Sequence, residues 1–106
     1  MRLNKIFIAG HLTRDPETKQ VKQQTVCKFT IGVNYGEETF FLNCDAWDKL
    51  GETVQGNVTK GMLVIVEGRL KENKYTKKDG TQVIGFDVVC TNVQWVSKTV
   101  VRDDPF

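Results

Sequence analysis

The residues of this chain that could do chemistry are aromatic rings and basic side chains, and that chemistry is noncovalent binding. Phe41 and Trp47 stand in a segment where apolar and polar residues alternate, so in a strand both rings lie on the polar face. A loop or a partner subunit can cover such rings; alternatively, they can stack on nucleobases, at about 1–3 kcal/mol per base. We favour stacking, because two large rings on an otherwise polar face need a binding partner.

Tyr75 adds a third ring inside a basic segment. Five basic residues and one acid, Glu72, lie between positions 69 and 78. Rings alternating with ammonium groups suit a flexible polyanion, because the rings stack on bases while the cations neutralise phosphates. Tyr35 is a fourth candidate ring, with packing in a turn as the alternative. The predicted phosphate contacts are Lys5, Arg14, Lys28, Lys49, Arg69, Lys71, Lys74, Lys77 and Lys78.

The sequence gives little support for catalysis, metal binding or disulfide formation. His11 is the only histidine, and no HExxH, P-loop or nucleophile-elbow motif occurs. Cys27, Cys44 and Cys90 are odd in number and widely spaced, which favours buried reduced thiols over a disulfide framework or a zinc site. We expect a protein that is not an enzyme, with no cofactor and no metal. The N-terminal residues resemble no secretory signal, so we expect a cytoplasmic, nucleoid-associated location.

Period-two hydrophobicity predicts the elements that must position these residues. It indicates five strands over residues 6–12, 27–33, 40–46, 62–70 and 84–90. Residues 13–24 are predicted to be a polar connection, and Lys77–Gly80 the tip of a long hairpin. Helical spacing from Asp48 to Lys60 indicates one helix, with Asp48 as its cap and Gly61 at its stop. The predicted fold is all-β with this short helix: an OB fold, a five-stranded Greek-key barrel with the helix between strands three and four.

Several segments, in order, resemble bacterial single-stranded DNA-binding proteins. They include residues 4–17, residues 29–34, the run Phe41–Leu50, and Val66–Leu70, and the resemblance extends from about residue 3 to residue 96. It implies sequence-independent binding and protection of single-stranded DNA in replication, recombination and repair. It also implies an OB-fold homotetramer whose stacking rings are Phe41, Trp47 and Tyr75, with Tyr35 close to a fourth position. Two alternatives stay open: an RNA-binding barrel, and a primosomal-type adaptor that mainly docks proteins.

The chain is predicted to divide into a DNA-binding domain, residues 1–96, and a short tail, residues 97–106. The tail resembles the acidic Pro-Phe ending with which many family members recruit replication and repair proteins. Its candidate partner-binding residues are Asp103, Asp104, Pro105 and Phe106; a frayed terminus is the alternative. The brevity of this tail favours a phage, plasmid or specialised member of that family.

Overall fold

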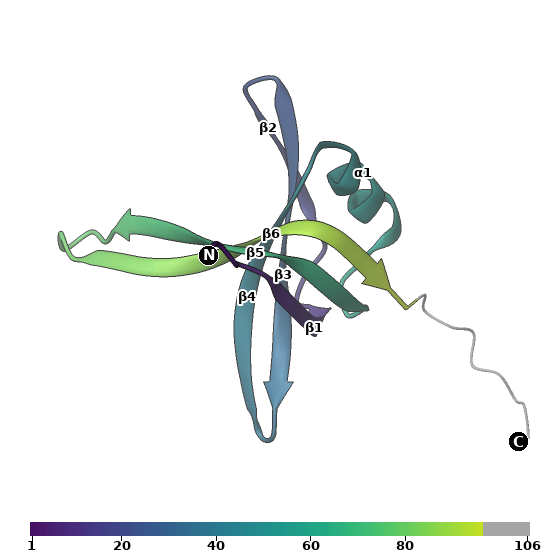
Figure 1. Ribbon diagram of the computed structural model, residues 1–106, viewed down its shortest axis with the longest axis horizontal. Helices are drawn as coiled ribbons and strands as arrows, with labels where there is room; N and C mark the ends of the chain where they lie inside the picture. Colours follow the sequence, from purple (N-terminus) through teal and green to yellow (C-terminus); the bar gives the residue numbers. More distant parts are fainter. Residues whose placement is uncertain (97–106) are drawn as a thin grey trace, which may run out of the picture.

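The computed structural model describes residues 1–96, which form a small barrel with three projecting hairpin arms (Figure 1). The predicted tail residues Asp103, Asp104, Pro105 and Phe106 lie outside the described residues. The elements in chain order are β1 (Ile6–Leu12), β2 (Glu17–Val21), β3 (Gln24–Tyr35), β4 (Glu38–Trp47), α1 (Asp48–Asn57), β5 (Leu63–Thr76) and β6 (Gln82–Trp95).

Five of these strands close into a ring in the order β1-β5-β6-β4-β3. The ring closes where β1 meets β3, through the pairs His11–Gly32 and Leu12–Ile31. All neighbouring strands run antiparallel except β4 and β6, which pair in parallel over Asn43–Asp45. A five-stranded closed ring with a helix between its third and fourth strands is the OB fold that the sequence predicts.

Strand β2 was not predicted, because its residues were assigned to a polar connection. Glu17–Val21 pairs with Gln24–Lys28 of β3 as a hairpin, and the turn passes through Lys22 at a φ of 56°. All five β2 side chains are exposed, so no apolar alternation marks this strand. The turn also lacks the glycine that most often signals a hairpin.

The helix is shorter than predicted and begins differently. It ends at Asn57, and its N-cap is Trp47, which makes no side-chain capping bond. Asp48 therefore does not cap the helix. It adopts a φ of 52°, and its carboxylate accepts hydrogen bonds from Gln24 Nε2 (2.9 Å) and the Thr25 amide (3.4 Å). Asp48 thus ties the start of α1 to the start of β3.

The buried stripe of the helix is as predicted, since Val54 and Val58 are fully buried and Leu50 is partly buried. Gly61, the predicted stop, instead lies in the turn that precedes β5. No helix within residues 1–96 is long and apolar enough to cross a membrane.

The core of the barrel consists of apolar side chains, many of them β-branched, together with the three cysteines. Cys27, Cys44 and Cys90 are all buried, as predicted, and none forms a disulfide among the described residues. A hydrogen bond with Cys90 and then burial raise the pKa of the Cys44 thiol, and burial raises the pKa of Cys27. Raised pKa values keep these thiols protonated, so they behave as small apolar core residues.

The hairpin arms extend past the barrel, so the core-facing sides of their strands are not fully covered. Phe40, Ile84 and Phe86 have the core-facing parity of their strands, yet each is about half exposed. Alternation predicts the face of a side chain, but it does not predict whether a second layer covers that face. The β5–β6 arm, which projects to the left in Figure 1, is two-stranded along its outer length.

Alanine substitutions at two glycines of α1 should change the free energy of unfolding in opposite directions. A Cβ on Gly51 would collide with the backbone carbonyl of Ala46, whereas a Cβ on Gly56 would meet nothing within 4 Å. We expect Gly51→Ala to lower the free energy of unfolding by about 1–3 kcal/mol. Gly56→Ala should raise it by about 0.4–1 kcal/mol, because alanine loses less backbone entropy. Urea unfolding measures both, and equal effects at the two sites would contradict this packing of the helix.

Candidate nucleic-acid interface

The outer face of β3 and β4 is organised as rows of directly paired residues. Antiparallel pairs share a face, and the register pairs β3 with β4 over ten positions. From the helix end toward the arm tip, the rows with outward parity are Val26–Trp47, in which Val26 is itself buried, then Lys28–Asp45, Thr30–Asn43, Gly32–Phe41 and Asn34–Thr39.

Both predicted rings of β4 lie on this face. Phe41 is 65% exposed, and Trp47 is half-buried beside the start of α1. The two rings are six residues apart on one strand, which corresponds to roughly 20 Å. More than one base therefore fits between them, and those bases meet polar side chains instead of a third ring.

Tyr75 joins this face from the neighbouring arm. On β5, Lys71 pairs with Asp87 of β6, and the alternation that continues through Asn73 places Tyr75 on the same side. Asp87 in turn pairs with the outward-facing Asn43 of β4. Tyr75 is 54% exposed, so its ring lies open on the arm beyond the β4 rows.

Tyr35 lies apart from the other rings. It ends β3 at the tip of the β3–β4 arm, opposite Glu38, and it is 80% exposed. The structure therefore brings Phe41, Trp47 and Tyr75 to one face of the molecule, while Tyr35, with the opposite parity on β3, points to the other face of the β3–β4 arm.

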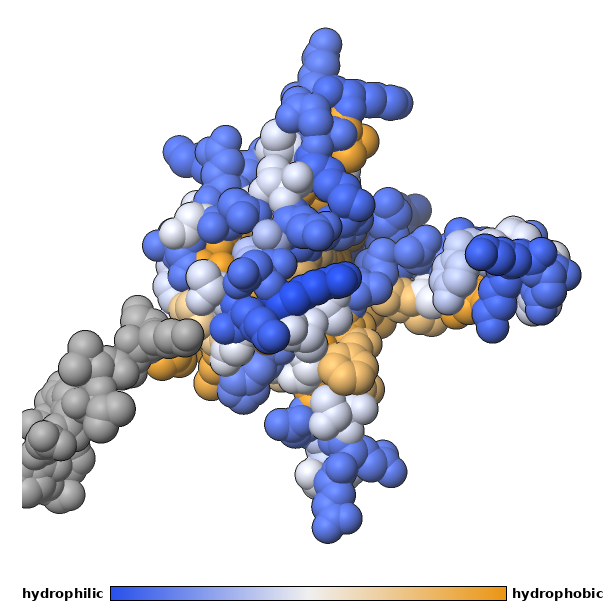
Figure 2. Space-filling view, turned by 180° about the vertical axis from the view of Figure 1, so that it is seen from behind, coloured by the Kyte–Doolittle hydropathy of each residue, from blue (hydrophilic) through white to orange (hydrophobic). Residues whose placement is uncertain are grey.

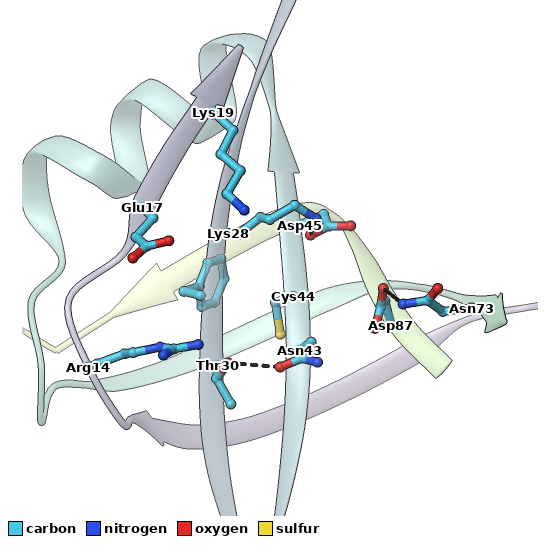
Figure 3. A pocket seen from close by; sticks show the side chains of 11 residues that line it. Arg14, Glu17, Lys19, Lys28, Thr30, Asn43, Cys44, Asp45, Asn73 and Asp87 are labelled. Atoms are coloured by element: carbon cyan, nitrogen blue, oxygen red, sulfur yellow. Dashed lines mark hydrogen bonds and ion pairs between the residues drawn. The ribbon is translucent and has the colours of Figure 1, made fainter. Parts of the chain in front are cut away.

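A polar depression of about 210 Å³ opens between the rings, where β2, β3, β4 and the base of the β5–β6 arm meet (Figure 3). Its side chains are already hydrogen-bonded in pairs. Thr30 Oγ1 donates to Asn43 Oδ1 at 2.8 Å, and Asn73 Nδ2 donates to Asp87 Oδ2 at 3.1 Å. Basic and acidic groups line it in equal number: Arg14, Lys19 and Lys28 with Glu17, Asp45 and Asp87.

Lys28 is held at the centre of this depression by acids. Its Nζ lies 3.0 Å from Asp45 Oδ1, and the β2–β3 register places Glu17 directly opposite on the other side. Asp45 is 92% buried, the one charged residue buried to this degree among residues 1–96. Because Asp45 already compensates the charge of Lys28, we expect this lysine to contribute less to phosphate binding than a cation without an acidic partner.

The remaining predicted cations fall into two groups: those that form an ion pair with a carboxylate and those that do not. Lys5 pairs with Glu67 at 2.9 Å on the β1–β5 side of the barrel, and Lys74 pairs with Glu72 at 3.3 Å on the opposite face of the arm from Tyr75. Six others are exposed, with no carboxylate partner within residues 1–96: Arg14 at the depression, Lys49 in the first turn of α1, and Arg69, Lys71, Lys77 and Lys78 on the arm.

The tip of the arm is a defined turn, as predicted. The Lys77 amide donates to the Thr81 carbonyl and the Gly80 amide to the Lys77 carbonyl. Asp79 Oδ1 accepts from the Thr81 amide at 2.9 Å, and this backbone hydrogen bond lowers the pKa of the Asp79 carboxyl. Lys77 and Lys78 are thus presented by an ordered loop.

Of the residues that line the depression, only Arg14 and Lys28 were predicted as site residues; Lys19, Asn73 and Asp87 are among those that sequence reasoning missed. Lys19 stands in the Val26–Trp47 row through its pairing with Val26, and it would have been found had residues 17–21 been identified as a strand. Asn73 of β5 and Asp87 of β6 are diagonal neighbours at the root of the arm, joined by a hydrogen bond. For Asn73, the alternation with Tyr75 along β5 was the available signal.

The Lys28–Asp45 pair should matter for stability more than other ion pairs of the surface. We expect Lys28→Met to lower the free energy of unfolding by about 1–3 kcal/mol, because it leaves a buried carboxylate without its partner. Lys5→Met, which breaks the exposed pair with Glu67, should cost less than about 0.5 kcal/mol. Adding Asp45→Asn to Lys28→Met should recover part of the loss. Chemical unfolding of the four proteins tests this, and equal losses for Lys28→Met and Lys5→Met would contradict it.

Comparison with known proteins places this architecture in one family. The model of the Single-strand binding protein family matches residues 3–96. A single-stranded DNA-binding protein of Halalkalibacterium halodurans is 35% identical over 89% of this chain and 61% of its own length, and one of Clostridium perfringens is 33% identical over 89% and 66%. Single-stranded DNA-binding protein 1 of Staphylococcus aureus MSSA476 is 35% identical over 96% of this chain and 70% of its own. The chain spans about three fifths of the length of several such relatives. With its OB barrel and its matched residues 3–96, the chain belongs to the single-strand binding protein family.

Proposed function

We propose that this protein binds single-stranded DNA without sequence preference and protects it during replication, recombination and repair, and that it is not an enzyme. The observation that supports this most directly is the outward placement of Phe41 and Trp47 on β4, with Tyr75 on the same side of the adjoining arm. Rings stack on any base, because every base has a π-face. The relatives named above are single-stranded DNA-binding proteins by name.

In this proposal, bases and phosphates meet different parts of the surface. Bases stack on Phe41 and Trp47 and span the neutral depression between them. Phosphates follow the exposed cations around it: Arg14 and Lys49 near the barrel, and Lys71, Lys77 and Lys78 along the arm. Releasing the counterions of those phosphates contributes affinity that falls as salt is added.

We further propose that the protein works as a homo-oligomer, a homotetramer in the family manner, in the cytoplasm. Figure 2 shows hydrophilic tips on the three arms and apolar surface gathered nearer their bases. Several large apolar side chains are exposed: Leu3 before β1, Phe7 on β1, and Leu70, Ile84 and Phe86 on the β5–β6 arm. Exposed apolar side chains of this size support contact between copies.

The tail residues Asp103, Asp104, Pro105 and Phe106 remain a proposed docking segment for replication or repair proteins. An acidic peptide with a terminal ring suits a pocket bordered by basic side chains. This proposal rests on sequence alone.

A salt-dependent titration against single-stranded DNA, duplex DNA and RNA of equal length tests the function. We expect single-stranded DNA to bind most tightly, with log K falling linearly with log salt. Lys77→Ala and Lys78→Ala should each reduce the slope by about 0.7, the value for one lost contact on a single strand. Lys28→Met should leave the slope unchanged, because its charge is already paired.

Equal affinity for duplex DNA would overturn the proposal. Tighter binding of RNA would favour the RNA-binding alternative, and weak binding of all three with little salt dependence would favour the adaptor.

Tryptophan fluorescence tests the stacking role of Trp47. Poly(dT) should quench the emission of the wild type, and Trp47→Phe should remove most of the quenching. Trp95 is the matched control: it pairs with Val64 and packs against the core, so Trp95→Phe should keep the quenching. Quenching that survives in Trp47→Phe and disappears in Trp95→Phe would contradict the assignment.

A further inference from the structure

One row of the outer face extends onto a third strand and ends in a ring. His11 of β1 pairs directly with Gly32 of β3, and Gly32 pairs directly with Phe41 of β4. Because directly paired residues share a face, His11 and Phe41 stand on the same side of the barrel with only a glycine between them. From sequence, His11 was interpreted as an ordinary residue at the end of a strand.

Because Gly32 has no side chain, the Phe41 ring lies against the backbone of β3 between these two positions. A Cβ placed on Gly32 would lie 3.5 Å from Phe41 Cε1 and 3.7 Å from Phe41 Cδ1. The Phe41 ring therefore leans over the bare backbone of β3, toward β1. Neighbouring strands are about 4.8 Å apart, so His11 stands roughly two strand spacings from Phe41, and the leaning ring covers part of that distance.

His11 has no structural task that would explain its position. It is exposed, and its imidazole makes no hydrogen bond or ion pair with any residue in the range 1–96. Its own outer-face neighbour on β5 is Leu63, which is apolar and partly buried. The neighbours of His11 on the two adjoining strands are thus an apolar side chain on β5 and a glycine on β3.

We propose that His11 is a further DNA-binding residue, which continues the Phe41 stacking surface across Gly32 onto β1. This inference rests on the proposed binding of single-stranded DNA and extends that site by one position. The base that follows the one stacked on Phe41 lies beyond the edge of that ring, on the side of β1, and stacks against the imidazole. The strand then leaves the β3–β4 face toward β1, on the side away from Tyr75.

Substitutions at His11 separate stacking from charge. In fluorescence-anisotropy titrations with oligo(dT) at fixed salt, His11→Ala should weaken binding about tenfold, within the range found when one stacked ring is removed. His11→Phe should restore wild-type affinity, because it keeps a ring, whereas His11→Lys should not. Restoration by lysine and not by phenylalanine would assign His11 to a phosphate and overturn the stacking proposal.

Gly32→Val provides an independent test, because it places a side chain between the two rings. Valine suits a strand better than glycine does, and its Cβ would make only ordinary contacts. We therefore expect thermal stability to be kept while oligo(dT) affinity falls at least as far as in His11→Ala. The matched control is Ala9→Val, at an exposed outward position of β1 two residues from His11, which should leave affinity unchanged.

The outcomes distinguish this inference from the function on which it rests. A wild-type protein that does not bind oligo(dT) would refute the proposed function itself. A wild type that binds, together with His11→Ala and Gly32→Val proteins that are folded and bind equally well, would refute only the role of His11.

Discussion

The binding face depends on one constraint, the register between β3 and β4. Cys44 and Ala46 are fully buried against the core, and side chains alternate along a strand, so the residues at the other parity must point outward. A slip of one residue would bury Phe41 and Trp47 and expose the core. The ten paired positions of β3 and β4, closed on the far side by Leu12 and Ile31, make such a slip costly. The outward direction of the interface residues on β4 therefore follows from the packing of the barrel core.

Because the strands extend past the barrel, the arms carry residues such as Tyr75 beyond it. The same extension leaves apolar side chains on the arms uncovered. The β5–β6 arm presents Tyr75 on one face, while Ile84 and Phe86 continue the core parity on the other. A two-stranded ribbon has no second layer of its own, so those side chains stay exposed within one copy. Isolated hairpins are only marginally stable. Covering the apolar face with another copy would therefore order the arm as well as bury its surface, which links the proposed oligomer to the presentation of Tyr75.

The sequence predicts those parts of the fold whose alternation is tied to burial. The ring strands, the buried stripe through Val54 and the outward rings of β4 all follow from period and parity. Strand β2 could not be predicted, because all of its side chains are exposed and it forms by pairing with β3 alone. The role of Asp48 was also out of reach, because its hydrogen bonds to Gln24 and Thr25 join segments 23 and 24 residues apart. The ion pair of Lys28 similarly needs the register, since basic residues in a sequence do not reveal which carboxylate stands opposite.

The distribution of charge across the face constrains how a strand of DNA could lie on it. The middle of the face is neutral, with Lys28 between Glu17 and Asp45 and with Asp87 at the root of the arm. A phosphate there gains little from Lys28, whose charge Asp45 already compensates, and stands close to three carboxylates, which disfavours it. Exposed cations surround this region, on the arm and near α1. A strand whose bases point toward the neutral middle and whose phosphates point toward the surrounding cations fits this distribution of charge. Phe41 and Trp47, at the two ends of the neutral region, then stack on bases that already point toward them. Carboxylates in the middle of this face are therefore compatible with the proposed binding of DNA, because they would favour a strand whose bases, and not its phosphates, turn toward the protein.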